Sequence, residues 1–413
     1  MFGAILWMLQ GWLPPKWALL GAMLPLLKFG FFSYWINSYW GGAVAAFGGA
    51  LVMGALPRIL HKHRPIHALI LGIGVGILAN SRPFEGAILC IPVAIVLCID
   101  IFGPDHSPLE ITVPRVVIPL GSVLLLTLAF VLFYNWRVTD HPLLFPHVLN
   151  DRANLTVPNF VWSKPNPPKQ YPNHEFDVLY NHLARNYYAH TWNDFVRLSR
   201  RKFDDFTRFF VSFGMVAPFL MVPYVLLDRR VRLLAVQFAL CCLGLLAVVW
   251  FHPHYAAPVV PTFFAILAQM FRHLRRWNYR GRAVGIGLTR VTVLFAAAAI
   301  PFQFADVVRD PRPVSGFDWG LVNWQRAEIS SKLDSMPGGQ LVIVRYSQTH
   351  HNVNYEWVYN AADIDHAKVV WAREIPGVDT SPLIAYFKDR NVWLVEADAD
   401  PQRLEPYPLN PQH

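Results

Sequence analysis

Long apolar blocks separated by short polar gaps constrain this chain more than any other feature of its sequence. An α-helix rises 1.5 Å per residue, so about 20 apolar residues cross the roughly 30 Å hydrocarbon core of a bilayer. Of the 413 residues, 54% are hydrophobic and only 15% are charged. The blocks predict a polytopic α-helical membrane protein with about nine or ten spans, the full ones at residues 17–32, 41–60, 66–79, 87–99, 116–134, 209–227, 233–251, 257–271 and 284–301.

The first apolar run, residues 2–13, is shorter than a span, because its dozen residues cover only about 18 Å as a helix. No basic residue precedes it, as one would in a signal peptide. We therefore expect this run to be the end of a span, in a chain that lacks the N-terminal part of a longer protein.

Basic residues occupy alternate gaps between the blocks: Lys16, Arg58, Lys62, Arg64, Arg115, the arginines at 229, 230 and 232, and those at 272, 275, 276, 280 and 282. By the positive-inside rule these gaps are cytoplasmic. The remaining gaps then face outward, including the long polar loop at residues 135–205. Much of the net charge of +9 lies in the short loops, so it predicts orientation and no nucleic-acid partner.

From about residue 303 the hydropathy falls, and helix and strand patterns alternate. Strands are expected at residues 340–345, 368–371 and 391–396, and helices at 323–335 and 381–388. The predicted domains are therefore a transmembrane domain, 1–302, and a small extracytoplasmic α/β domain, 303–413.

The four cysteines predict neither a disulfide nor a metal site. Cys90, Cys98, Cys241 and Cys242 all lie inside apolar blocks, where cysteine behaves as a small hydrophobic residue.

Residues 80–86, Asn-Ser-Arg-Pro-Phe-Glu-Gly, place Arg82 and Glu85 between two apolar blocks. Pro83 has no backbone N–H and disfavours helix at Arg82, so a turn or a broken helix is expected. Charges this close to spans mark either a functional site or an ion pair that anchors the turn. The sequence leaves both readings open.

Two other outward gaps are rich in aromatic and polar side chains: Tyr34, Trp35, Asn37, Tyr39 and Trp40 in one, and His252, His254 and Tyr255 in the other. Such side chains commonly form an aromatic belt at the membrane surface. Flat rings and amides also suit a platform for a sugar. If the spans bundle, we expect both gaps and the Arg82 turn to meet in one outward cavity beneath the long loop.

A cavity of this composition offers what transfer from a lipid-linked sugar needs. Arg82, His252 and His254 are candidates to neutralise the leaving phosphate. The aromatic and amide side chains would orient the sugar. Glu85 is a weak candidate for the base that takes a proton from the acceptor hydroxyl, or it orients Arg82. The two histidines have no third ligand nearby in the sequence, so no metal site is predicted.

Residues 32–42, 80–86 and 254–258 resemble bacterial multi-pass glycosyltransferases of the GT-C superfamily, in the branch related to protein O-mannosyltransferases and aminoarabinose transferases. The resemblance implies a polyprenyl-phosphate-linked sugar donor, an acceptor of unknown identity, and transfer at the outer face of the bacterial inner (plasma) membrane. It also implies a periplasmic C-terminal domain, and it places Arg82, His254 and Tyr255 either at the donor phosphate or in the cavity around it.

The resemblance has one departure. The catalytic aspartate of this family lies in the first outer loop, and no residue here matches it. A chain without that loop is expected to be a glycosyltransferase-like protein that is inactive alone. No cofactor follows from the sequence, which leaves open whether a divalent metal helps to hold the phosphate.

Two other functions stay open. A non-catalytic membrane assembly or sensor protein would act through the long loop and the C-terminal domain, and the missing acidic loop favours it. A transporter would need inverted repeats and ionisable residues at mid-membrane depth, whereas the predicted span interiors are mostly uncharged. The expected partners are the lipid bilayer, the polyprenyl-phosphate sugar donor and the acceptor.

Overall fold

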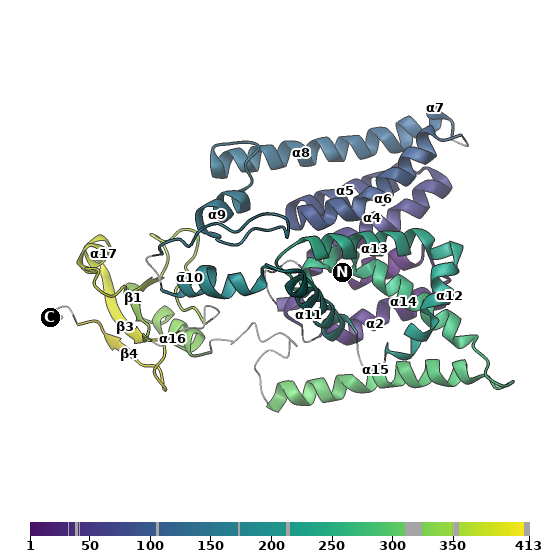
Figure 1. Cartoon of the computed structure of the whole chain (residues 1–413). Helices are drawn as coiled ribbons and strands as arrows, with labels where there is room; N and C mark the ends of the chain where they lie inside the picture. Colours follow the sequence, from purple (N-terminus) through teal and green to yellow (C-terminus); the bar gives the residue numbers. More distant parts are fainter. Residues whose placement is uncertain are drawn as a thin grey trace. The chain divides into compact units, whose positions relative to one another are not determined.

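The computed structural model describes residues 1–31, 33–37, 40, 42–104, 107–171, 174–211, 215–309, 324–348, 350 and 355–408. The chain forms two compact units (Figure 1). The helical unit comprises Met1–Asn166 and Asn186–Gly316, and the α/β unit comprises Pro167–Arg185 and Phe317–His413. This division differs from the predicted one, because the α/β unit includes part of the long loop.

The helical unit contains helices of very different lengths. In chain order they are α1 (Phe2–Leu9), α2 (Pro15–Phe29), α3 (Tyr34–Asn37), α4 (Gly42–Lys62), α5 (Pro65–Ser81), α6 (Pro83–Phe102), α7 (Leu109–Thr112), η1 (Val113–Val117), α8 (Ile118–Thr139), α9 (Pro146–Asn154), η3 (Ala184–Tyr187, which begins in the α/β unit), α11 (Trp192–Phe210), η5 (Ala217–Met221), α12 (Val222–Leu227), η6 (Arg229–Val231), α13 (Arg232–Ala247), η7 (Pro253–Tyr255), η8 (Ala257–Val259), α14 (Val260–Arg275) and α15 (Val284–Arg309).

Five helical stretches of the described chain are long and apolar enough to cross a membrane: Gly42–Lys62, Pro83–Phe102, Leu109–Thr139, Arg229–Ala247 and Val284–Phe302. Several of them expose apolar side chains as lipid-facing helices do; on α8, Leu125 and Leu126 are 68% and 71% exposed. Two more apolar helical stretches, Pro65–Ser81 and Ala217–Leu227, are shorter. The predicted helical membrane architecture is present in this coarse form, and the predicted number of spans stays a prediction.

The predicted span at residues 209–227 does not form one continuous helix in the described part of the chain. Phe209 and Phe210 end α11, which begins at Trp192. Residues 217–227 form η5 and α12 instead, each with a proline in its first turn. Proline removes a backbone donor and breaks a regular helix, which a count of apolar residues does not register.

The glycine-rich helix α4 lies at the centre of the helical unit, as its small residues predict. About two thirds of its apolar window, 67%, is buried inside the protein. A Cβ added at Gly49 would lie 2.0 Å from the carbonyl oxygen of Pro258, so only glycine lets η8 approach α4 this closely. The α4 backbone therefore sets the position of the chain that follows His254 and Tyr255.

A buried amide joins three further helices of this unit. The Gln237 side chain on α13 donates to the Leu89 carbonyl on α6 over 3.1 Å. It also accepts a hydrogen bond of 2.6 Å from the Thr262 hydroxyl on α14. Because both polar ends of the amide are satisfied, Gln237 can stay fully buried among apolar helices.

The α/β unit contains a four-stranded sheet in which the strands are arranged in the order β2-β1-β3-β4. Strand β1 runs parallel to both of its neighbours, β2 and β3, and β4 runs antiparallel to β3. Three strands match the predicted ones to within two residues, and the short β4 was not predicted. The elements of the α/β unit are, in chain order, α10 (His174–Asp177), η2 (Val178–Leu183), α16 (Trp324–Asp334), β1 (Gly339–Arg345), β2 (Val369–Arg373), α17 (Ser381–Tyr386), β3 (Arg390–Glu396) and β4 (Leu404–Pro406).

An ion pair fastens the loop segment 167–185 to this sheet. The Arg373 guanidinium on β2 lies 2.7 Å from the Glu175 carboxylate on α10, and both side chains are largely buried. The two parts of a packed soluble unit cannot lie on opposite faces of a bilayer. The long loop and the C-terminal domain therefore share one side of any membrane that the chain crosses.

This shared side can be tested by cysteine labelling in sealed vesicles. In a variant whose native cysteines are replaced by alanine, Gln170→Cys and Lys388→Cys should react equally with a membrane-impermeant maleimide. Asn278→Cys should show the opposite accessibility, because the span candidate Val284–Phe302 separates it from the C-terminal domain. Unequal labelling at 170 and 388 would contradict the assembly of the α/β unit.

Candidate functional site

The predicted break at Arg82 is confirmed. Helix α5 ends at Ser81, α6 begins at Pro83, and Arg82 between them has the non-helical angles φ −143° and ψ 73°. Proline is favoured at the first position of a helix and disfavours helical geometry at the residue before it. The local sequence therefore turns the Arg82 side chain out of both helices.

The Arg82 guanidinium stacks on the ring of Tyr255, with its carbon 4.2 Å from the ring centroid. Tyr255 lies in the 3₁₀ turn η7, which Pro253 opens and Pro258 follows before α14 begins. No carboxylate of the described residues lies within the 4.0 Å ion-pair distance of Arg82, so the alternative of an Arg82–Glu85 ion pair is not formed.

His254, in the same turn, contacts the aromatic residues of the gap at 34–40. The Tyr34 hydroxyl lies 2.9 Å from Nδ1 of His254. The Trp40 ring stands edge-on to the His254 ring, with centroids 5.1 Å apart. The Tyr255 ring is also 5.1 Å from that of His254. Residues from three separate gaps thus form one group, which we call the Arg82 cluster: Tyr34, Trp40, Arg82, His252, His254 and Tyr255.

The other three predicted residues of the gap at 34–40, Trp35, Asn37 and Tyr39, are not among the residues of the Arg82 cluster. Trp35 is only 4% exposed and packs against Phe29 and Phe210, at 5.2 and 5.5 Å between ring centroids. It supports the cluster from below and offers no surface to a ligand. Tyr39 and the side chain of Asn37 lie outside the described residues.

The histidines of the cluster are uncharged at neutral pH. Burial, reinforced by the charge of Arg82, lowers the pKa of His254 to about 2 and that of His252 to about 4. Burial also raises the pKa of Tyr34 to about 12. The expectation that a histidine supplies positive charge is therefore not met, and the charge of the cluster is that of Arg82.

A histidine held neutral makes the protein less stable in acid, because only the unfolded chain takes up the proton. For His254 this loss begins as the pH falls below about 6.5 and reaches about 2 kcal/mol at pH 5. We expect the thermal unfolding midpoint to fall less from pH 7 to pH 5 in His254→Asn, whose amide oxygen can replace Nδ1. Equal falls in both proteins would contradict a neutral His254.

The first part of the long loop packs beside the cluster. The Phe160 ring lies 5.0 Å from that of Phe84, which follows Pro83. Val161 donates to the carbonyl of Ala247, and Val249 donates to that of Asn159, over 3.0 and 2.8 Å. These bonds tie the loop to the chain that leads from α13 into the histidine turn.

Asp151 is a residue near the cluster that sequence reasoning missed. It lies on α9, and its carboxylate accepts a 2.7 Å hydrogen bond from the Asn159 side chain. The negative charge of this carboxylate also interacts electrostatically with the Tyr255 hydroxyl. Asp151 and Tyr255 are 104 positions apart in the sequence, and no spacing signal would have paired them.

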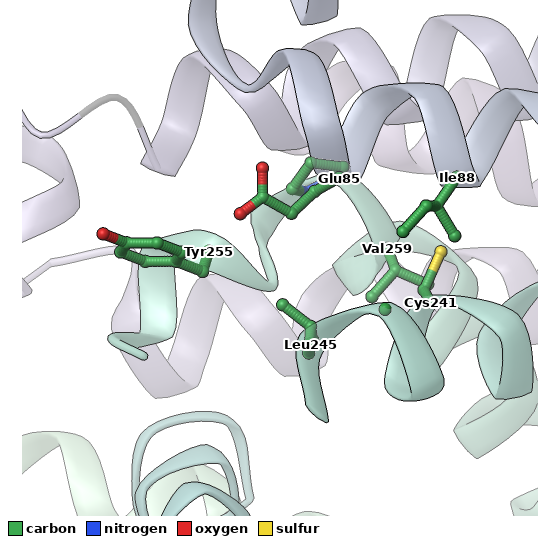
Figure 2. A pocket seen from close by; sticks show the side chains of 8 residues that line it. Glu85, Ile88, Cys241, Leu245, Tyr255 and Val259 are labelled. Carbon is green, nitrogen blue, oxygen red and sulfur yellow. The ribbon is translucent and has the colours of Figure 1, made fainter. Parts of the chain in front are cut away.

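Glu85 lines a narrow recess behind Tyr255 and not the open face of the cluster. The recess holds about one water molecule and is bounded by Glu85, Ile88, Cys241, Gly244, Leu245, Tyr255, Pro258 and Val259. Figure 2 shows the Glu85 carboxylate on the Tyr255 side of this recess, with Cys241 at its other end. An acceptor molecule does not fit there, so the geometry gives no support to Glu85 as the base.

No protein-family model, no curated protein and no solved structure matches the chain. Among the described residues, no three His, Cys, Asp or Glu side chains gather where they could hold a metal ion.

Proposed function

We propose that the Arg82 cluster binds the phosphate of a polyprenyl-phosphate-linked sugar, and that the protein is a membrane glycosyltransferase or a glycosyltransferase-like protein that acts on this donor. The observation that carries the proposal is a guanidinium, without a carboxylate partner among the described residues, stacked on an aromatic ring at the junction of two apolar helices.

The stacked geometry leaves Arg82 able to bind an anion. The Tyr255 ring covers one face of the planar guanidinium, whereas the five N–H donors lie along its edges. Edge donors in this arrangement can form paired hydrogen bonds with a phosphate. A headgroup at the membrane surface would bring such a phosphate within reach while its chain stays in the lipid.

The uncharged members of the cluster suit the sugar. When Tyr34 donates to Nδ1 of His254, the imidazole proton sits on Nε2 and can be donated to a hydroxyl or a phosphate oxygen. Trp40 is 44% exposed and offers part of a ring face for stacking. We assign no catalytic base. That the donor carries a sugar, that an acceptor receives it and that the cluster faces outward are all parts of the proposal.

The test is donor binding by the detergent-solubilised protein, measured for a polyprenyl phosphate by microscale thermophoresis. We expect Arg82→Ala to weaken binding about 10- to 100-fold, since charge-assisted hydrogen bonds contribute about 1.5–3 kcal/mol. Tyr255→Phe should bind almost normally because it keeps the ring face, and Tyr255→Leu should bind less well.

Arg64→Ala is the matched control. Arg64 caps the opposite end of the same helix, α5, so its loss changes the net charge equally but leaves the cluster intact. Equal affinities for wild type and Arg82→Ala would end the proposal. So would equal binding of the polyprenyl phosphate and the corresponding polyprenol.

A further inference from the structure

Helix α11 is a second feature of the helical unit that needs a partner. Its start is well defined: the Thr191 side chain accepts from the Asp194 backbone, and the Asp194 side chain accepts from that of Thr191. This capping box and the absence of proline and glycine favour an unbroken helix over all 19 residues. Such a helix presents fixed faces.

The apolar face of α11 is only partly covered by protein. Leu198, Phe209 and Phe210 are buried, and the Phe206 ring packs on that of Phe263 at 5.3 Å. Beside them Trp192, Val196 and Phe203 remain 73%, 49% and 66% exposed. At about 100° per residue these three positions fall within about 40° of one another, so they form a continuous stripe.

The opposite face of α11 is charged. Arg197, Arg201 and Arg208 lie about 140–180° around the helix from Trp192, and all three are exposed. Arg201 stacks on Tyr187, and Arg197 pairs with Asp194 at 2.9 Å. An aromatic stripe opposite an arginine-bearing face is the pattern of helices that lie in the surface of a membrane.

The direction of α11 fits the same location. In Figure 1 α11 is seen closer to end-on, whereas α8 and α15 in the same unit are seen from the side. The helix is therefore inclined to α8 and α15 and does not share their direction, as expected of a helix at the surface of a membrane that they cross.

We propose that α11 lies flat in the headgroup layer of the membrane, with Trp192, Val196 and Phe203 inserted at the boundary of the acyl chains. The occupant of the stripe is lipid, because this chain carries its own bilayer-crossing candidates and the charged face points away from the stripe. At its other end α11 places Phe209 5.5 Å from the Tyr34 ring, so the membrane contact positions the cluster that holds His254.

The experiment measures the depth of a fluorescent bimane on the full chain, with the native cysteines replaced by alanine, in phosphatidylcholine vesicles. Labels at Phe203→Cys and Val196→Cys should be quenched by lipids with a doxyl group at acyl carbon 5 at least about twofold more than a label at Arg197→Cys. Aqueous iodide should give the reverse order.

The two stripe positions are independent, so failure of one variant to fold leaves the other as the test, and size-exclusion profiles identify folded variants. Quenching of the stripe labels by iodide, at the level seen for position 197, would overturn the proposal. Protection from both iodide and doxyl lipid would also overturn it, and would assign the stripe to a protein contact such as a second copy of the chain.

Discussion

The stacking of Arg82 on Tyr255 is the interaction on which the candidate site depends. A guanidinium at the junction of two apolar helices is costly to desolvate, so it needs a partner that does not remove its ability to bind a ligand. A carboxylate would neutralise the charge. An aromatic ring stabilises the cation through its face and leaves the donor edges open.

Proline and glycine place the two partners. Pro83 ends the helical run at Arg82, and Pro253 and Pro258 keep the histidine turn from joining α14. Gly49 then lets this turn press against α4, where any side chain would collide with the Pro258 carbonyl. The polar groups of the cluster are thus carried by backbone breaks, which lie between helices whose own backbone groups are satisfied internally.

Local features of the fold were predictable from sequence, and contacts between distant segments only in part. The break at Arg82, the strands β1, β2 and β3 and the central place of α4 follow from proline, apolar runs and small residues. Apolar content alone did not separate the end of an amphipathic helix from a span at residues 209–227. It also did not show that Trp35 faces inward or that Asp151 lies near Tyr255, because both depend on packing that no periodicity encodes.

A double-mutant cycle on Arg82→Ala and Tyr255→Leu tests the central contact most directly, with unfolding free energies measured in mixed micelles. The account predicts that the double variant is less destabilised than the sum of the single variants by about 0.5–2 kcal/mol, the energy of a cation–π contact. Additive effects, to within about 0.3 kcal/mol, would show that the two side chains do not interact and would contradict the account.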